Sequence, residues 1–126
     1  MFSLCKKGVR YVHRVPPTAV DFTKNSFIWD AVCRELDLSS IVPANAKLVH
    51  ISVEFKSTDD GNYIGFTSTD DSEMWVIKKT RTQVANIAVS SNFNVALSTP
   101  QTISYFAKLY SGEVSNLEVM ILGWWI

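Results

Sequence analysis

From residue 47 onwards, apolar and polar side chains alternate in a way that predicts a β-strand. The apolar positions of this segment are Val49, Ile51, Val53 and Phe55. Successive side chains of a strand point to opposite faces, so a period of two gives one apolar face and one face toward water. The sequence Asp59-Asp60-Gly61-Asn62 follows, and it is typical of a tight turn because glycine and asparagine tolerate positive φ values. We therefore expect a hairpin into a second strand at 63–67.

Further short segments have the same apolar character. They span residues 74–79, 83–89, 93–97, 102–109 and 115–126. Turn-forming residues separate them at 68–72, 90–92, 98–100 and 111–112. Turn signals about 8 to 12 residues apart are typical of a β-sandwich or barrel.

Residues 26–38 allow two interpretations. Their apolar residues follow a candidate N-cap, Ser26, at helical spacing, yet the segment also fits two short strands broken near Arg34. We favour strands because the rest of the chain is β. With them the count reaches about eight, so we predict an all-β fold, an antiparallel β-sandwich of jelly-roll type.

The last predicted strand has two apolar faces. Strict alternation places Leu117, Val119, Ile121 and Trp125 on one face and Met120, Leu122, Trp124 and Ile126 on the other. A strand in a two-layer sandwich normally has one face in water. Another copy of the chain, or else the N-terminal segment or a loop, must cover the second face. We favour a subunit interface made by Met120, Leu122, Trp124, Trp125 and Ile126.

Length and composition fit a single domain with an ordinary hydrophobic core. The chain has 126 residues, 47% of them hydrophobic, and two cysteines that lie in no metal-binding or redox spacing. A chain of this size buries enough surface to fold without disulfides or metal ions. It has no apolar run long enough to cross a membrane and no recognisable secretion signal, so we expect no membrane insertion.

Charge is distributed unevenly between the two ends of the chain. Residues 1–20 carry Lys6, Lys7, Arg10 and Arg14 and no acid, whereas residues 21–126 carry eight basic and twelve acidic side chains. Pro16-Pro17 interrupts any regular structure between the two parts. We therefore divide the chain into a basic N-terminal arm, 1–20, and one β-sandwich domain, 21–126. Four cations beside a single aromatic residue are a weak footprint for nucleic acid. We expect these four residues to anchor the chain on an acidic surface of a larger assembly, the alternative being an arm that stays solvated.

Several segments resemble a known group of proteins. The run Leu36-Asp37-Leu38-Ser39-Ser40-Ile41-Val42-Pro43-Ala44-Asn45-Ala46-Lys47 is similar to the entry to an alternating strand in small β-sandwich domains of tailed-bacteriophage structural proteins. Arg81-Thr82-Gln83-Val84-Ala85-Asn86 and Leu122-Gly123-Trp124-Trp125 resemble other recurring pieces of that group. The resemblance covers residues 36–126. It implies a jelly-roll-like domain, commonly trimeric, displayed on a virion as a fibre tip, collar or head-decoration domain.

Candidate catalytic and metal-binding residues are few. The two histidines, His13 and His50, have no nucleophile motif around them, so we expect no enzymatic activity and no cofactor. The acidic residues near the predicted turns are Asp59, Asp60, Asp70 and Asp71. Their spacing matches no calcium loop. We interpret them as solvated turn carboxylates and keep Ca²⁺ as a weak alternative.

Aromatic residues are the best candidates for ligand binding. There are more of them than one inner face can hold, and an exposed ring can stack on a sugar. We select Trp75 and Tyr110, which adjoin polar loops, as candidate glycan-binding residues. We therefore expect a homotrimeric phage virion protein that contacts other virion proteins and host surface carbohydrate. The alternative is a soluble carbohydrate-binding module or lectin with no virion role.

Overall fold

The computed structural model of the chain describes residues 10–14, 20–68, 78–98 and 101–126. Within these residues the elements, in chain order, are β1 (Tyr11–His13), β2 (Phe22–Thr23), the 3₁₀ turn η1 (Lys24–Ser26), β3 (Arg34–Asp37), β4 (Leu48–Ser57), β5 (Tyr63–Ser68), β6 (Lys78–Arg81), β7 (Val89–Ala96), β8 (Thr102–Lys108) and β9 (Val114–Trp125). In the described part of the chain, no helix is long and apolar enough to span a membrane.

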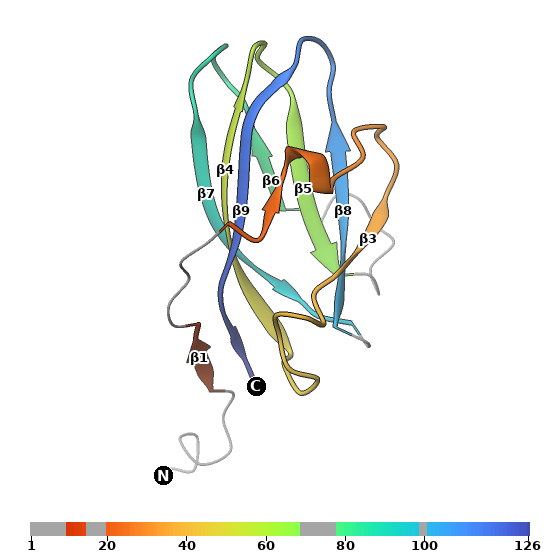
Figure 1. Cartoon of the computed structure of the whole chain (residues 1–126), viewed down its shortest axis with the longest axis vertical. Helices are drawn as coiled ribbons and strands as arrows, with labels where there is room; N and C mark the ends of the chain where they lie inside the picture. The colour runs from red at the N-terminus through yellow and green to blue at the C-terminus, as the bar shows by residue number, and fades with distance from the viewer. Residues whose placement is uncertain (1–9, 15–19, 69–77, 99–100) are drawn as a thin grey trace.

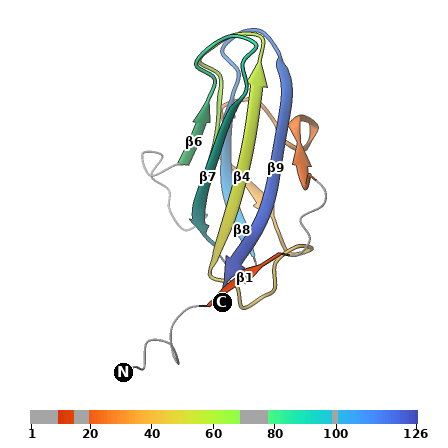
Figure 2. The same cartoon turned by 90° about the vertical axis from the view of Figure 1, so that its left-hand side faces the viewer.

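The strands form two antiparallel sheets that pack face to face, as Figures 1 and 2 show. The first sheet has the order β1-β9-β4-β7, with β2 also paired to β9, and the second has the order β3-β8-β5-β6. β1 and β2 pair with different parts of β9, so they act as one interrupted edge strand. Counted in this way, the described residues contain eight strands that wind between the sheets as in a jelly roll. The predicted all-β jelly-roll sandwich is confirmed.

The long strands β4 and β9 form the centre of the first sheet. β4 alternates as predicted, because Val49, Ile51, Val53 and Phe55 are fully buried. These positions pair with β9 and β7, and Val53, for example, lies opposite Val119 on one side and Ser91 on the other. The local period of two therefore identified this strand and its buried face correctly.

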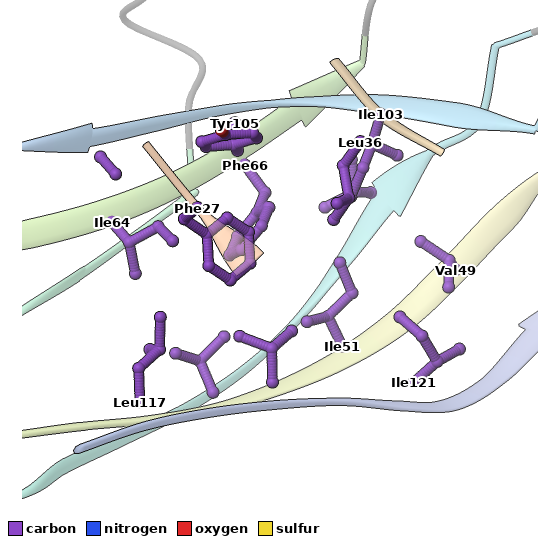
Figure 3. Packing of buried hydrophobic residues seen from close by; sticks show 14 of the residues in the cluster. Phe27, Leu36, Val49, Ile51, Ile64, Phe66, Ile103, Tyr105, Leu117 and Ile121 are labelled. Atoms are coloured by element: carbon purple, nitrogen blue, oxygen red, sulfur yellow. The ribbon is translucent and has the colours of Figure 1, made fainter. Parts of the chain in front are cut away.

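Phe27 fills the middle of the core. The segment that carries it, just after η1, passes from β2 at the edge of the first sheet to β3 at the edge of the second (Figure 1). Its ring lies edge-on to Tyr105, with centroids 4.9 Å apart, and edge-on to Phe66 at 6.1 Å. Figure 3 shows this ring between the residues of β5 and β8 and those of β4 and β9. The connection thus closes one open side of the sandwich with an aromatic side chain.

The predicted hairpin between residues 47–56 and 63–67 is wrong, although both strands exist. β4 belongs to the first sheet and β5 to the second, so residues 58–62 cross between the sheets instead of pairing two neighbours. Gly61 adopts a positive φ of 84°, as the turn sequence predicted. Turn chemistry reveals a change of direction, but it does not reveal which sheet the next strand joins.

A buried asparagine organises this crossing. The Asn62 side-chain amide donates to the carbonyl of Ser111 at 2.9 Å and accepts from the backbone N–H of Tyr110 at 2.6 Å. Its backbone carbonyl accepts from the N–H of Thr82 at 2.9 Å, and the Thr82 hydroxyl also contacts it at 3.2 Å. Asn62 is fully buried. The side-chain amide of Asn62 therefore links the β4–β5 and β8–β9 connections, and its backbone carbonyl adds the β6–β7 connection at the same end of the sandwich.

Three other predicted segments differ from the structure. Residues 26–38 contain one strand, β3, and not two, because Ile28 and Val32 are exposed in an irregular segment. Residues 83–88 form a loop, whereas the predicted turn at 90–92 lies inside β7 and pairs with β4. Of the strand predicted at 74–79, residues 74–77 lie outside the described residues. Serine and asparagine in β7 resemble a turn locally, but pairing with a long neighbouring strand keeps them extended.

Candidate functional site

The C-terminal half of β9 carries the predicted subunit interface, and a β-bulge changes its geometry. Ile121 pairs with Ile51 and Gly123 pairs with His50, so Leu122 is an extra residue with no partner on β4. Such a bulge shifts the alternation by one position. The predicted faces of Trp124 and Trp125 are therefore exchanged. Trp124 packs against the core, whereas Trp125 lies on the outer face.

The outer face beyond the bulge holds a cluster of rings. The Tyr11 ring lies 4.6 Å from that of Trp125 and 6.1 Å from that of His50, and its hydroxyl is 3.2 Å from His50 Nδ1. Gly123 makes this approach possible, because a Cβ atom there would lie 2.3 Å from the Tyr11 hydroxyl oxygen. The ring centroids of His13 and Tyr11 are 6.5 Å apart. The two histidines, far apart in sequence, thus flank one tyrosine of the arm.

The arm covers part of the second face of β9. The backbones of Arg10 and Ile126 exchange two hydrogen bonds of 3.0 and 2.9 Å, and β1 continues this pairing. Even so, Met120, Leu122, Trp125 and Ile126 remain half-buried, and Tyr11 is 37% exposed. Met120, Leu122 and Trp125 therefore leave an apolar strip along the outer side of this strand end in the described chain, whereas Ile126, the residue after Trp125, points to the side of Trp124.

The basic residues of the arm have different surroundings. Lys6 and Lys7 lie outside the described residues, and Arg10 is exposed. Arg14 forms an ion pair with Asp21 at 2.5 Å, and its guanidinium also donates to the carbonyl of Ile121 at 3.2 Å. The Asp21 carboxylate accepts a further hydrogen bond from the Ile121 N–H at 2.8 Å. Arg14 and Asp21, which flank residues 15–19 in the sequence, are thus both bound to the edge of β9.

Tyr110 belongs to an aromatic surface on the outer face of the second sheet. It is 60% exposed, and its ring lies 6.3 Å from Tyr63, which stacks on Phe106 at 5.8 Å. The Lys79 and Lys108 ammonium groups each lie 4.6 Å above a tyrosine ring, those of Tyr63 and Tyr110 respectively. Burial raises the pKa of the Tyr63 phenol above its ordinary value. Trp75, the other candidate glycan-binding residue, lies outside the described residues.

The acidic residues of the crossing lie near one another at the same end of the sandwich. Asp59 is half-buried beside Gly112, where a Cβ atom would come within 2.9 Å of the Asp59 carboxyl carbon, and Asp60 is exposed. Asp70 and Asp71 lie outside the described residues. Among the residues that the structure describes, no three histidine, cysteine or acidic side chains gather to hold a metal ion.

A hollow of about 340 Å³ lies close to this end, and sequence reasoning did not single it out. Its lining residues are Lys24, Asn25, Trp29, Leu109, Glu113 and Val114. They come from η1 and the segment after it, from the β8–β9 connection and from the first residue of β9. An aromatic residue close to polar residues was the available signal for Trp29, which is half-buried, but only the fold brings Glu113 beside it.

Comparison with known proteins gives a remote structural likeness. No protein-family model and no curated protein matches the sequence. A C2 crystal form of the tobacco streak virus coat protein aligns with a TM-score of 0.39 and 15% identity, covering 94% of this chain and 84% of that chain. A structure of the tobacco streak virus coat protein dimer aligns with a TM-score of 0.38 and 14% identity, covering 93% and 81%. At these values no residue role is transferred from the coat proteins to this chain.

Proposed function

We propose that this chain is a structural protein of a bacteriophage virion, a fibre tip, collar or head-decoration domain, and that it acts by assembly and binding rather than by catalysis. Two features support this proposal. Segments throughout residues 36–126 resemble phage structural domains, and these residues form most of an eight-stranded jelly roll. The trimeric state and the virion location follow from the resemblance.

The observation that carries the proposal is the apolar strip at the end of β9. Met120, Leu122 and Trp125 are each half-buried in the single chain, beside the partly exposed Tyr11, and the terminal Ile126 is half-buried next to them. A row of large apolar side chains on the outer face of a sheet is typical of a surface that another protein covers. Trp124 is removed from the predicted interface, since it packs against the core.

Solution mass tests the assembly. Light scattering after size exclusion should give three times the chain mass of 14.2 kDa. Met120→Lys places a charge in the strip and should convert the trimer into a folded monomer. Ser90→Lys is the matched control, because Ser90 is exposed on β7, on the outer face of the same sheet. A wild-type chain that stays at 14.2 kDa over a wide concentration range would overturn the trimer.

The arm is proposed to anchor the trimer through Lys6, Lys7 and Arg10. Arg14 was predicted to share this role, but its ion pair with Asp21 gives it a task within the chain. A variant with Lys6, Lys7 and Arg10 changed to Gln keeps the β1 backbone and should fold normally while losing incorporation into particles. Unchanged incorporation of this variant would contradict the anchor.

A carbohydrate-binding module or lectin without a virion role is the second candidate function. The exposed Tyr110 ring beside Tyr63 and Phe106 supports it, because such rings stack on sugars. This function requires neither a trimer nor the basic arm. A monomer that binds glycans and loses nothing with the arm variant would favour the lectin over the virion protein.

A further inference from the structure

The geometry points to a binding site for an uncharged pyranose sugar in the hollow beside Trp29. This inference deepens the proposed contact with surface glycans and places it away from Tyr110. The volume of about 340 Å³ lies at the lower end of the range of roughly 300–1,000 Å³ for small-ligand sites. A hollow of this size suits a ligand of one or two sugar rings.

Trp29 provides a rigid aromatic wall for this site. One face of its indole stacks on the fully buried Phe55, with centroids 5.5 Å apart and ring planes 29° apart. The indole Nε1–H donates to the carbonyl of Lys24 at 3.1 Å. Both contacts hold the ring in place before any ligand arrives. An immobile ring loses little entropy on binding, and its free surface can stack on the C–H face of a sugar.

The lining residues Glu113 and Val114 are also held in place. The Glu113 N–H donates to the Thr58 hydroxyl at 2.8 Å, and the Glu113 carbonyl accepts from the Thr58 N–H at 2.9 Å. The Lys24 ammonium donates to the carbonyl of Val114 at 3.2 Å. Backbone pairing therefore fixes the position of Glu113, while its side chain is exposed to the hollow and to solvent.

The chemistry of the lining residues favours a neutral polyhydroxyl ligand. The Glu113 carboxylate accepts hydrogen bonds from hydroxyl groups, and the Asn25 amide both donates and accepts them. Lys24 and Glu113 carry opposite charges, so the hollow has no net charge to attract an anion. Leu109 and Val114 add apolar surface against which C–H groups can pack. The surface around Tyr110 differs, because Lys79 and Lys108 make it cationic.

Titration of the full chain with methyl glycosides of glucose, galactose, mannose and N-acetylglucosamine, followed by ¹H–¹⁵N NMR, tests the site. We expect at least one glycoside to shift the Trp29 indole signal, which Trp29→Phe identifies by its loss. Glu113→Gln should weaken that binding about fivefold, since the neutral hydrogen bond that glutamine keeps is worth about 1 kcal/mol less than one to a charged group. Glu54→Gln is the control, because Glu54 is exposed on β4.

Three results would overturn the inference: no shift of the Trp29 indole with any glycoside, equal binding by Glu113→Gln and wild type, or a preference for glucuronate over neutral sugars. Trp29→Phe keeps a ring to pack on Phe55, so the fold should survive this change, and the backbone spectrum verifies it. The glycoside titration tests the Trp29 site whether the chain is a monomer or a trimer. A monomer that binds a glycoside at Trp29 would refute the virion trimer and retain the site.

Discussion

Replacement of Asn62 by Ala should remove the side-chain links between the β4–β5 and β8–β9 connections at one end of the sandwich, while the backbone bond to Thr82 stays in place. The two shortest bonds of the amide are those to the Ser111 carbonyl and the Tyr110 N–H, at 2.9 and 2.6 Å. Longer contacts of 3.3 to 3.4 Å join it to the Ser57 hydroxyl, the Asp59 carbonyl and the Ser111 N–H. The methyl side chain of alanine can form a hydrogen bond with none of these groups.

The expected loss can be estimated from the two short bonds. Each intramolecular hydrogen bond contributes about 1 kcal/mol net, and a buried group left without a partner costs about 1–3 kcal/mol. Since Asn62 is fully buried, water does not simply replace the amide. We expect Asn62→Ala to lower the free energy of unfolding by about 2–4 kcal/mol. That is a large part of the roughly 5–15 kcal/mol of a typical domain.

Urea unfolding followed by tryptophan fluorescence measures this loss. With a slope of about 2 kcal/mol per molar urea, a loss of 3 kcal/mol moves the midpoint down by about 1.5 M. Hydrogen exchange gives a second measure, because the Tyr110 amide should lose protection in Asn62→Ala. Asn62→Asp retains an acceptor for that amide and should protect it better than alanine does.

The matched control is Asn94→Ala, the same chemical change at an exposed position of β7. It should alter the free energy of unfolding by no more than about 0.5 kcal/mol. If Asn62→Ala stayed within 1 kcal/mol of wild type, or if Tyr110 kept its protection, the Asn62 amide would not be what links the β4–β5 and β8–β9 connections.

Three further predictions concern the arm, the core and the response to acid. Gly123→Ala should displace Tyr11, because the new Cβ would lie 2.3 Å from the Tyr11 hydroxyl oxygen. Amide hydrogen exchange in β1 should then become faster, and unchanged exchange would contradict the contact. Phe27→Ala should cost about 3–5 kcal/mol in urea unfolding, since it empties the middle of the core, and a loss below about 1 kcal/mol would refute that role. The Ser39 N–H, 2.8 Å from the Asp37 carboxylate, lowers the pKa of Asp37, so the unfolded chain binds more protons near that pKa and stability falls as the pH falls through the folded pKa. Asp37→Asn should therefore show a smaller loss of stability between neutral pH and about pH 3, whereas an identical acid profile would contradict this.

The strongest local patterns were enough to predict the fold class and its longest strands. In β4, hydrophobic alternation identified both the strand and its buried face, because side-chain direction along a strand depends only on the local period of two. The apolar C-terminal segment was likewise recognised as a strand, and it is β9. Tyr110 was correctly expected to be exposed beside polar loops.

What the local pattern missed depends on contacts between distant segments. The bulge at Leu122 exchanged the faces of Trp124 and Trp125, and such a bulge is defined by the neighbouring strand β4. The hollow beside Trp29 combines the segment after η1 with Glu113, which lies 84 residues later in the sequence. Neither the bulge nor the hollow can be recognised from the residues next to it in the sequence.

Local patterns were thus enough to establish that this chain forms β-strands, where most of the long ones lie and that its last strand is apolar on both sides. The folded chain was needed to establish which sheet each strand joins, which side of β9 the arm covers and which polar groups gather around Asn62. Alternation and turn propensity act over a few residues. Strand partners, bulges and buried hydrogen bonds are instead selected by the packing of the whole chain.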